Sequence, residues 1–85
     1  MDDKIIATIL YRLYNQGKWG NHGHTPIDNA AKGFPKHLIG EVRKTIDKLV
    51  KQKLLIKAKH NYGDGISLNS EKLKEIEKII EKRTQ

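Results

Sequence analysis

Basic side chains gather between residues 35 and 53, at a spacing that places most of them on one side of a helix. The segment carries six basic and two acidic residues, so it supplies +4 of the chain's formal net charge of +7. At 100° per residue, one outward face collects cationic groups and no large apolar side chain. The residues on this face are His37, Gly40, Lys44, Lys48 and Lys51. Such a face suits a polyanion, and nucleic acid is the commonest one.

A simpler explanation of the same composition is a thermophilic surface, because Lys- and Ile-rich chains without cysteine are typical of thermophiles. Comparison with residues 71–85 favours a more specific role for the basic helix. It is equally rich in charge, yet its acidic and basic residues nearly balance, with a net charge of +1. More than half of the chain's excess positive charge therefore lies in residues 35–53, under a quarter of its length.

Two histidines in a glycine-rich bend could share a metal ion, because His22 and His24 are one residue apart. A protein metal site needs three or four ligands. The third would have to be His37, His60 or Asp28, and neither a cysteine nor an H-x-x-x-H pair supports such a site. We expect no metal and no cofactor.

Catalytic patterns are also weak. Ser67 and Ser70 stand where a strand and a helix cap are expected, and neither lies in a glycine-flanked nucleophile turn. The glycine-rich segment 17–23 lacks the spacing of a phosphate-binding loop. With 85 residues and no paired carboxylates in view, we expect a binding module and not an enzyme.

Apolar residues recur at helical spacing in four segments, which must position these side chains. We expect helices over about residues 3–16, 26–31, 35–53 and 70–83. Gly17 should end the first, while Thr25 should cap the second with Pro26 in its first turn. The buried stripe of the third should consist of Ile39, Val42, Ile46, Leu49 and Val50.

Between the third and fourth helices the apolar period changes to two, which is typical of strands. Leu54, Ile56 and Ala58 alternate with Leu55, Lys57 and Lys59. A turn rich in Gly and Asp follows, and Ile66 and Leu68 then continue the alternation. We therefore expect a two-stranded hairpin over about residues 54–69, after which Asn69 or Ser70 caps the last helix.

This order of elements resembles the winged helix-turn-helix family. The resemblance covers about residues 3–80, and the stretch HTPIDNAAKGFPKHLIGEVRKTIDKLVKQKLLIKAKHNYGDGISLN is similar to small archaeal winged-helix proteins. It implies an α+β, mainly α fold in which residues 1–85 form one domain. That domain would have a three-helix core, a two-stranded wing and a C-terminal helix.

The resemblance also implies that the helix of residues 35–53 lies in the major groove of double-stranded DNA. The wing would touch the DNA backbone or the minor groove. The positions that would contact DNA are Lys36, His37, Gly40, Glu41, Arg43, Lys44, Lys48, Lys51, Lys57, Lys59, His60 and Tyr62. Gly40 suggests either close backbone approach to a partner or tight helix packing. With only three arginines in the chain, we expect phosphate contacts to dominate and sequence preference to be modest.

We therefore expect a DNA-binding transcriptional regulator. The alternative is a winged-helix adaptor that binds a protein or a ribosomal or otherwise structured RNA. In that case Trp19, Phe34 and the apolar stripes of the first and last helices would matter more than the lysines. Those two helices could pack together within one chain or form a homodimer.

No run of 18 apolar residues exists, and Met1-Asp2-Asp3 is not the basic start of a signal peptide. We therefore expect a soluble, cytoplasmic protein that does not enter a membrane.

Overall fold

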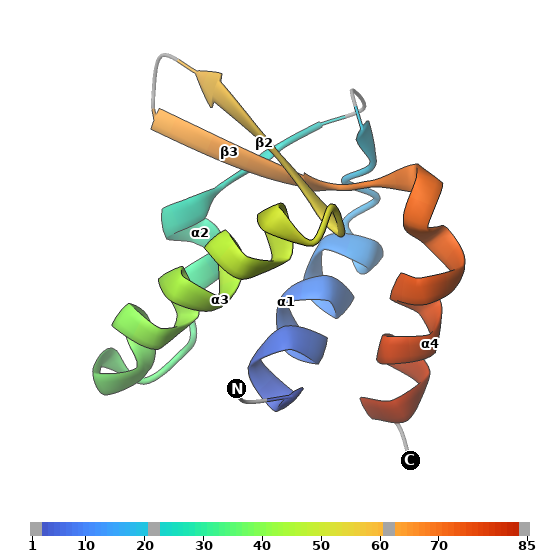
Figure 1. Ribbon diagram of the computed structural model, residues 1–85. Helices are drawn as coiled ribbons and strands as arrows, with labels where there is room; N and C mark the ends of the chain where they lie inside the picture. The colour runs from blue at the N-terminus through green and yellow to red at the C-terminus, as the bar shows by residue number, and fades with distance from the viewer. Residues whose placement is uncertain (1–2, 21–22, 61–62, 84–85) are drawn as a thin grey trace.

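The structure of the chain, a computed structural model, describes residues 3–20, 23–60 and 63–83. Its architecture is α+β and mainly helical, as the sequence predicted. Within the described residues the helices are α1 (Asp3–Asn15), α2 (Ile27–Ala31), α3 (Ile39–Lys51) and α4 (Leu73–Arg83), and the strands are β1 (Thr25–Pro26), β2 (Leu55–His60) and β3 (Gly63–Leu68). Helix α1 lies between α3 and α4, and the sheet covers one end of the helices (Figure 1).

Helix α1 supplies the centre of the core and ends where the sequence predicts. Its buried residues are Ile5, Ile6, Ala7, Ile9, Leu10 and Leu13. At the C-terminus, the N–H of Lys18 donates to the carbonyl of Leu13 and the N–H of Gly17 donates to that of Tyr14, both at 3.1 Å. This Schellman pair requires a left-handed residue, and Gly17 has φ +66°. The glycine therefore ends the helix for a backbone reason.

The start of α2 differs from the sequence expectation. Thr25 does not cap the helix, because Thr25 and Pro26 form β1 and pair with Ile66 and Gly65 of β3. The Thr25 hydroxyl instead donates to Oε1 of Gln16 at 3.2 Å. Pro26 fits this strand because its fixed φ is compatible with extended backbone and its missing N–H is tolerated at a sheet edge. The described sheet thus has three antiparallel strands in the order β1-β3-β2, where the sequence predicted two.

The basic helix is shorter than the predicted 35–53. A 3₁₀ turn, η2 (Lys36–Leu38), precedes α3. Inside α3 the buried residues are Val42, Thr45, Ile46 and Leu49. Thr45 is polar and was not expected in this stripe, but its hydroxyl donates to the carbonyl of Glu41 at 2.8 Å, which satisfies it. Ile39 and Val50 lie at the edge of the core and are only partly buried.

A second Schellman pair ends α3. The N–H of Leu54 donates to the carbonyl of Leu49 at 3.0 Å, and that of Lys53 donates to Val50 at 3.1 Å. The left-handed position is occupied by Lys53, whose φ is +66°. This turn buries Leu54 before β2 begins.

Strand β2 has the opposite face inward from the one that its apolar alternation favours, whereas Ile66 and Leu68 of β3 are buried as their alternation predicts. Leu55 is buried opposite Leu68, whereas Ile56 is 39% exposed. Lys57 lies opposite the buried Ile66. The cause is the turn before the strand, which already buries Leu54 and starts β2 one residue later. A shift by one residue moves every side chain of a strand to the other face.

Helix α4 packs against α1 within the same chain (Figure 1). Ile76 of α4 is fully buried in the core, and the Tyr14 hydroxyl of α1 donates to Oε2 of Glu77 at 2.8 Å. This hydrogen bond and the Coulomb repulsion of the carboxylate raise the pKa of Tyr14 above its ordinary value. Among the described residues, no helix combines the length and apolarity needed to cross a bilayer.

Candidate nucleic-acid interface

The outward side of α3 and η2 forms what we call the basic face. Its members are Lys36, His37, Gly40, Glu41, Lys44, Lys48 and Lys51, and all of them are exposed. Lys44, Lys48 and Lys51 are at helical spacings of four and three residues, so their ammonium groups follow one line along the helix. Within the described part of the chain, none of these three lysines forms an ion pair. Their charge is available to a partner.

Arg43 lies beside this face and is engaged within the chain. Its Nη2 donates to Oδ1 of Asp28, which ties α3 to α2. Both side chains are more than half exposed, so solvent screens the pair and its contribution to stability is small. Arg43 thus lies where the sequence analysis placed it, but the structure gives it a partner inside the protein.

The hairpin contributes fewer open charges than the helix. Nζ of Lys57 lies 3.3 Å from Oδ2 of Asp64, so an acid on β3 partly neutralises it. Lys59 is exposed and continues the same strand face toward the turn. Of the other expected contact positions, Tyr62 and the side chain of His60 lie outside the described residues.

Gly40 is exposed in the first turn of α3. A Cβ placed on it would meet no described atom within 4 Å. Tight packing against another helix of this chain therefore does not explain the glycine. Of the two explanations that the sequence left open, close approach by an external partner stays a prediction.

Arg12 of α1 holds the turn between α2 and α3, a role that the sequence analysis missed. Its Nη1 donates to the carbonyl of Lys32 at 2.6 Å and lies 3.4 Å from that of Ala30. Its guanidinium also stacks over the ring of Phe34, 4.7 Å from the centroid. Gly33 is left-handed, with φ +89°, and a Cβ there would lie 3.0 Å from Nη2 of Arg12. The turn and the arginine thus fit each other closely.

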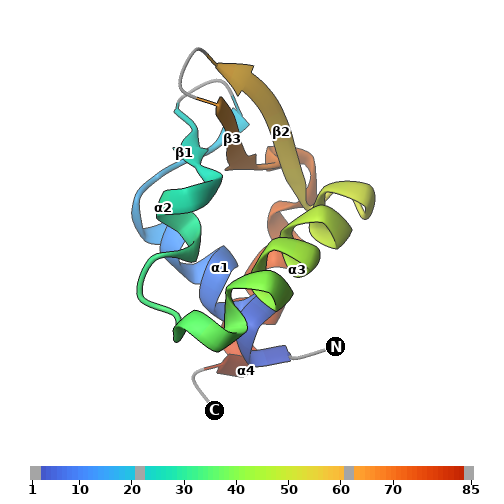
Figure 2. The ribbon, with the colours of Figure 1, turned by 90° about the vertical axis from the view of Figure 1, so that its left-hand side faces the viewer.

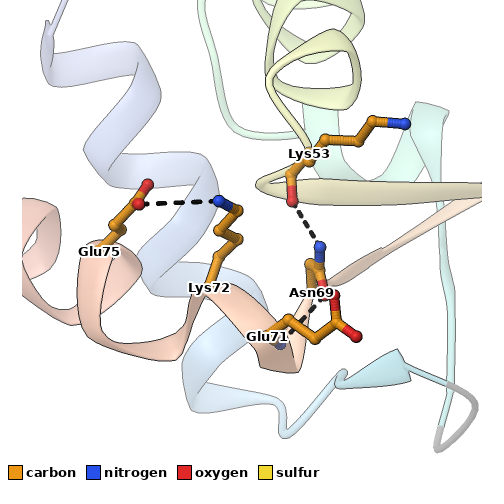
Figure 3. Close-up of polar contacts among 5 residues, drawn as sticks. All are labelled: Lys53, Asn69, Glu71, Lys72 and Glu75. Carbon is orange, nitrogen blue, oxygen red and sulfur yellow. Dashed lines mark hydrogen bonds and ion pairs between the residues drawn. The ribbon is translucent and has the colours of Figure 1, made fainter.

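Asn69 connects the other end of α3 to the hairpin and to α4 (Figure 3). Its Nδ2 donates to the carbonyl of Lys53 at 2.7 Å, and its Oδ1 accepts from the N–H of Glu71 at 3.1 Å. Lys72 and Glu75 form an ion pair of 3.8 Å in the first turn that follows. Of the two expected caps, Asn69 is therefore the one used, at the start of a 3₁₀ turn (Ser70–Lys72) that leads into α4. Its second hydrogen bond fixes where α3 ends relative to the sheet.

The two aromatic residues considered for an adaptor surface pack against the chain's own core. Trp19 meets Tyr14 edge to face, with ring centroids 5.8 Å apart and planes at 72°. Phe34 lies beneath Arg12. Both rings are partly buried against the core cluster, so neither projects as a free anchor.

Within the described residues, no three histidine or carboxylate side chains gather as metal ligands, and His22 lies outside those residues. A scan against protein-family models, a search of curated proteins and a search of solved structures each gave no match for this chain. Among the described residues, the surface presents exposed lysines along α3.

Proposed function

We propose that the chain is a winged helix-turn-helix protein that binds double-stranded DNA and regulates transcription. In this proposal α2, the turn of residues 32–35 and the α3 segment form the helix-turn-helix, and the β2–β3 hairpin is the wing. The observation that carries it is the basic face, whose three aligned lysines have no acidic partner among the described residues.

The position of α3 supports this function. Helix α3 and strand β2 lie along one side of the molecule (Figure 2), and neither α1 nor α4 covers the outer side of α3. The major groove of B-DNA is about 12 Å wide and admits one helix. A helix that enters it can place Lys44 and Lys48 near phosphates, while Lys59 approaches the backbone from the hairpin. Phosphate contacts of this kind give affinity with modest sequence preference.

We extend the proposal to a homodimer formed through α1 and α4. A groove of about 810 Å³ lies between the two helices, and its lining includes Ile6, Ala7 and Ile79. Leu73, the first residue of α4, is a further apolar side chain of this helix and is 41% exposed. Two copies related by a two-fold axis would bind half-sites about 34 Å apart.

The experiment replaces single lysines of the basic face by glutamate and measures binding to a labelled duplex by fluorescence anisotropy at two salt concentrations. Lys44→Glu and Lys48→Glu should each weaken binding without loss of helicity. Each lost phosphate contact should reduce the log–log salt slope by about 0.9. Lys78→Glu is the control, because Lys78 is an exposed lysine on α4 and the charge change is identical. If the two α3 variants bind the duplex with the same affinity as the control variant, the proposal is wrong.

The second candidate is an adaptor for a protein or a structured RNA, and the groove between α1 and α4 is the observation that favours it. Since Trp19 and Phe34 are packed inward, a protein-docking surface would have to use this groove. The same anisotropy experiment separates the candidates. Apolar docking would show little salt dependence, and an RNA-binding function would show preference for a structured RNA over the DNA duplex.

A further inference from the structure

A second, partly open cavity is lined by the C-terminal half of α1, the loop that follows it, β1 and α2. Its volume is about 240 Å³, just below the roughly 300–1,000 Å³ of pockets that hold drug-sized ligands. Ile9, Leu13 and Ala30 give it an apolar floor, and all three belong to the buried core. The size and the floor fit a small organic molecule.

Among the described residues that line this cavity, the charged side chains are all cationic. The polar lining consists of Arg12, Gln16, Lys18, His24, Thr25 and Asn29, and none of the described lining residues is acidic. The nearest carboxylate along α2, that of Asp28, is engaged by Arg43. A ligand that meets two cationic groups and several amide donors, with no opposing carboxylate, should itself be an anion.

Two backbone hydrogen bonds hold the main chain of Lys18 in place beside the cavity. The N–H of Lys18 donates to the carbonyl of Leu13 at 3.1 Å, and the carbonyl of Lys18 accepts from the N–H of Leu68 at 2.8 Å. The Lys18 side chain passes Gly23, where an added Cβ would lie 3.3 Å from its Cδ. Gly23 has φ +144°, so the backbone there suits glycine alone and leaves room for the lysine.

Some of the hydrogen-bond donors that line the cavity are not engaged by other groups of the described chain. Nη1 of Arg12 donates to two backbone carbonyls, and these hydrogen bonds hold the cationic guanidinium at the wall of the cavity. Gln16 accepts from Thr25 through Oε1, so its amide N–H groups stay available to a ligand. Within the described residues, the ammonium of Lys18 has no hydrogen bond or ion pair.

We propose that this cavity is a binding site for a small organic monocarboxylate. The carboxylate meets the ammonium of Lys18 and the amide of Gln16, and the apolar part of the ligand lies on Ile9 and Leu13. The site is independent of duplex binding: it uses no residue of the basic face, and its test contains no DNA.

The test titrates benzoate into the ¹⁵N-labelled full chain and follows backbone amide shifts, with neutral benzamide as the matched probe. We expect saturable shifts at Thr25, Asn29 and Ala30 with benzoate, and much weaker binding of benzamide. Lys18→Gln should weaken benzoate binding about tenfold, the effect of one charge-assisted hydrogen bond. Lys18→Arg should retain most of the affinity.

Lys78→Gln is the control variant, because Lys78 is an exposed lysine of α4 outside this cavity and outside the groove between α1 and α4, and the substitution removes an equal charge. It should bind benzoate as the unchanged protein does. Three outcomes would overturn the proposal: no saturable shift at the cavity residues, equal affinity for benzoate and benzamide, or shifts confined to the lysines of α3. Unchanged affinity in a folded Lys18→Gln protein would overturn it as well.

Discussion

Replacing Gly40 by alanine should change folding stability and duplex binding in opposite directions. An added Cβ meets no described atom within 4 Å, so the methyl group fits the folded chain without strain. Glycine within a helix costs about 0.5–1 kcal/mol relative to alanine because it loses more backbone freedom on folding. Gly40 lies in the first turn of α3, where fraying reduces this cost, so we expect a gain of about 0.5 kcal/mol.

The gain is measurable by thermal unfolding followed by circular dichroism. In a domain of this size, a change of 1 kcal/mol moves Tm by roughly 4–8 °C. Gly40→Ala should therefore raise Tm by about 2–4 °C. The matched control is Gly17→Ala, which also places a Cβ in open space but at φ +66°. Alanine in the left-handed conformation costs about 1 kcal/mol or more, so this variant should lower Tm.

The binding half of the prediction depends on the proposed DNA interface. If the α3 backbone approaches a duplex at Gly40, the methyl group holds the helix away from the groove. Gly40→Ala should then bind a duplex several-fold more weakly despite its higher stability. A lower Tm for Gly40→Ala would refute the reasoning about stability. A higher Tm with unchanged duplex affinity would show that the duplex does not approach this glycine closely.

Three further predictions concern the contacts that position α3 and α4. Asn69→Ala should lower stability by about 1–2 kcal/mol in urea unfolding, because it removes a helix cap and a second hydrogen bond. Asn69→Ser keeps a capping oxygen but removes the donor to the Lys53 carbonyl, so it should lose about half as much, and equal losses would contradict two separate roles. Lys53→Gly should raise stability by about 0.5–1 kcal/mol, because glycine tolerates φ +66° better than lysine; a decrease in the urea midpoint would speak against strain at this position. The raised pKa of Tyr14 means that its bond to Glu77 stabilises the fold below the ordinary tyrosine pKa and ceases to do so as pH rises through the raised value. The stability difference between the unchanged protein and Tyr14→Phe should therefore disappear in strong alkali, and a difference independent of pH would be inconsistent with this bond.

Parts of the candidate interface could be predicted from the sequence because they depend on local spacing. The exposure of Lys44, Lys48 and Lys51 follows from the burial of Val42 and Ile46, since a helix turns 100° per residue and opposite faces exclude each other. Whether Arg43 is free could not be predicted in this way. Its partner Asp28 lies on another helix, and the distance between them depends on how α2 packs against α3.

The sequence by itself determined the local features of this protein. Gly17 ends the first helix, Asn69 caps the last one and an apolar stripe orients the basic helix, because each depends on residues within a few positions of one another. Tertiary structure alone decided the pairing of Thr25 and Pro26 with β3, which face of β2 is buried, the hydrogen bonds from Arg12 to the α2–α3 turn, and the cavity beside Lys18. Each of these joins residues far apart in the chain, so its energy comes from contacts that exist only after the helices and the sheet have packed together.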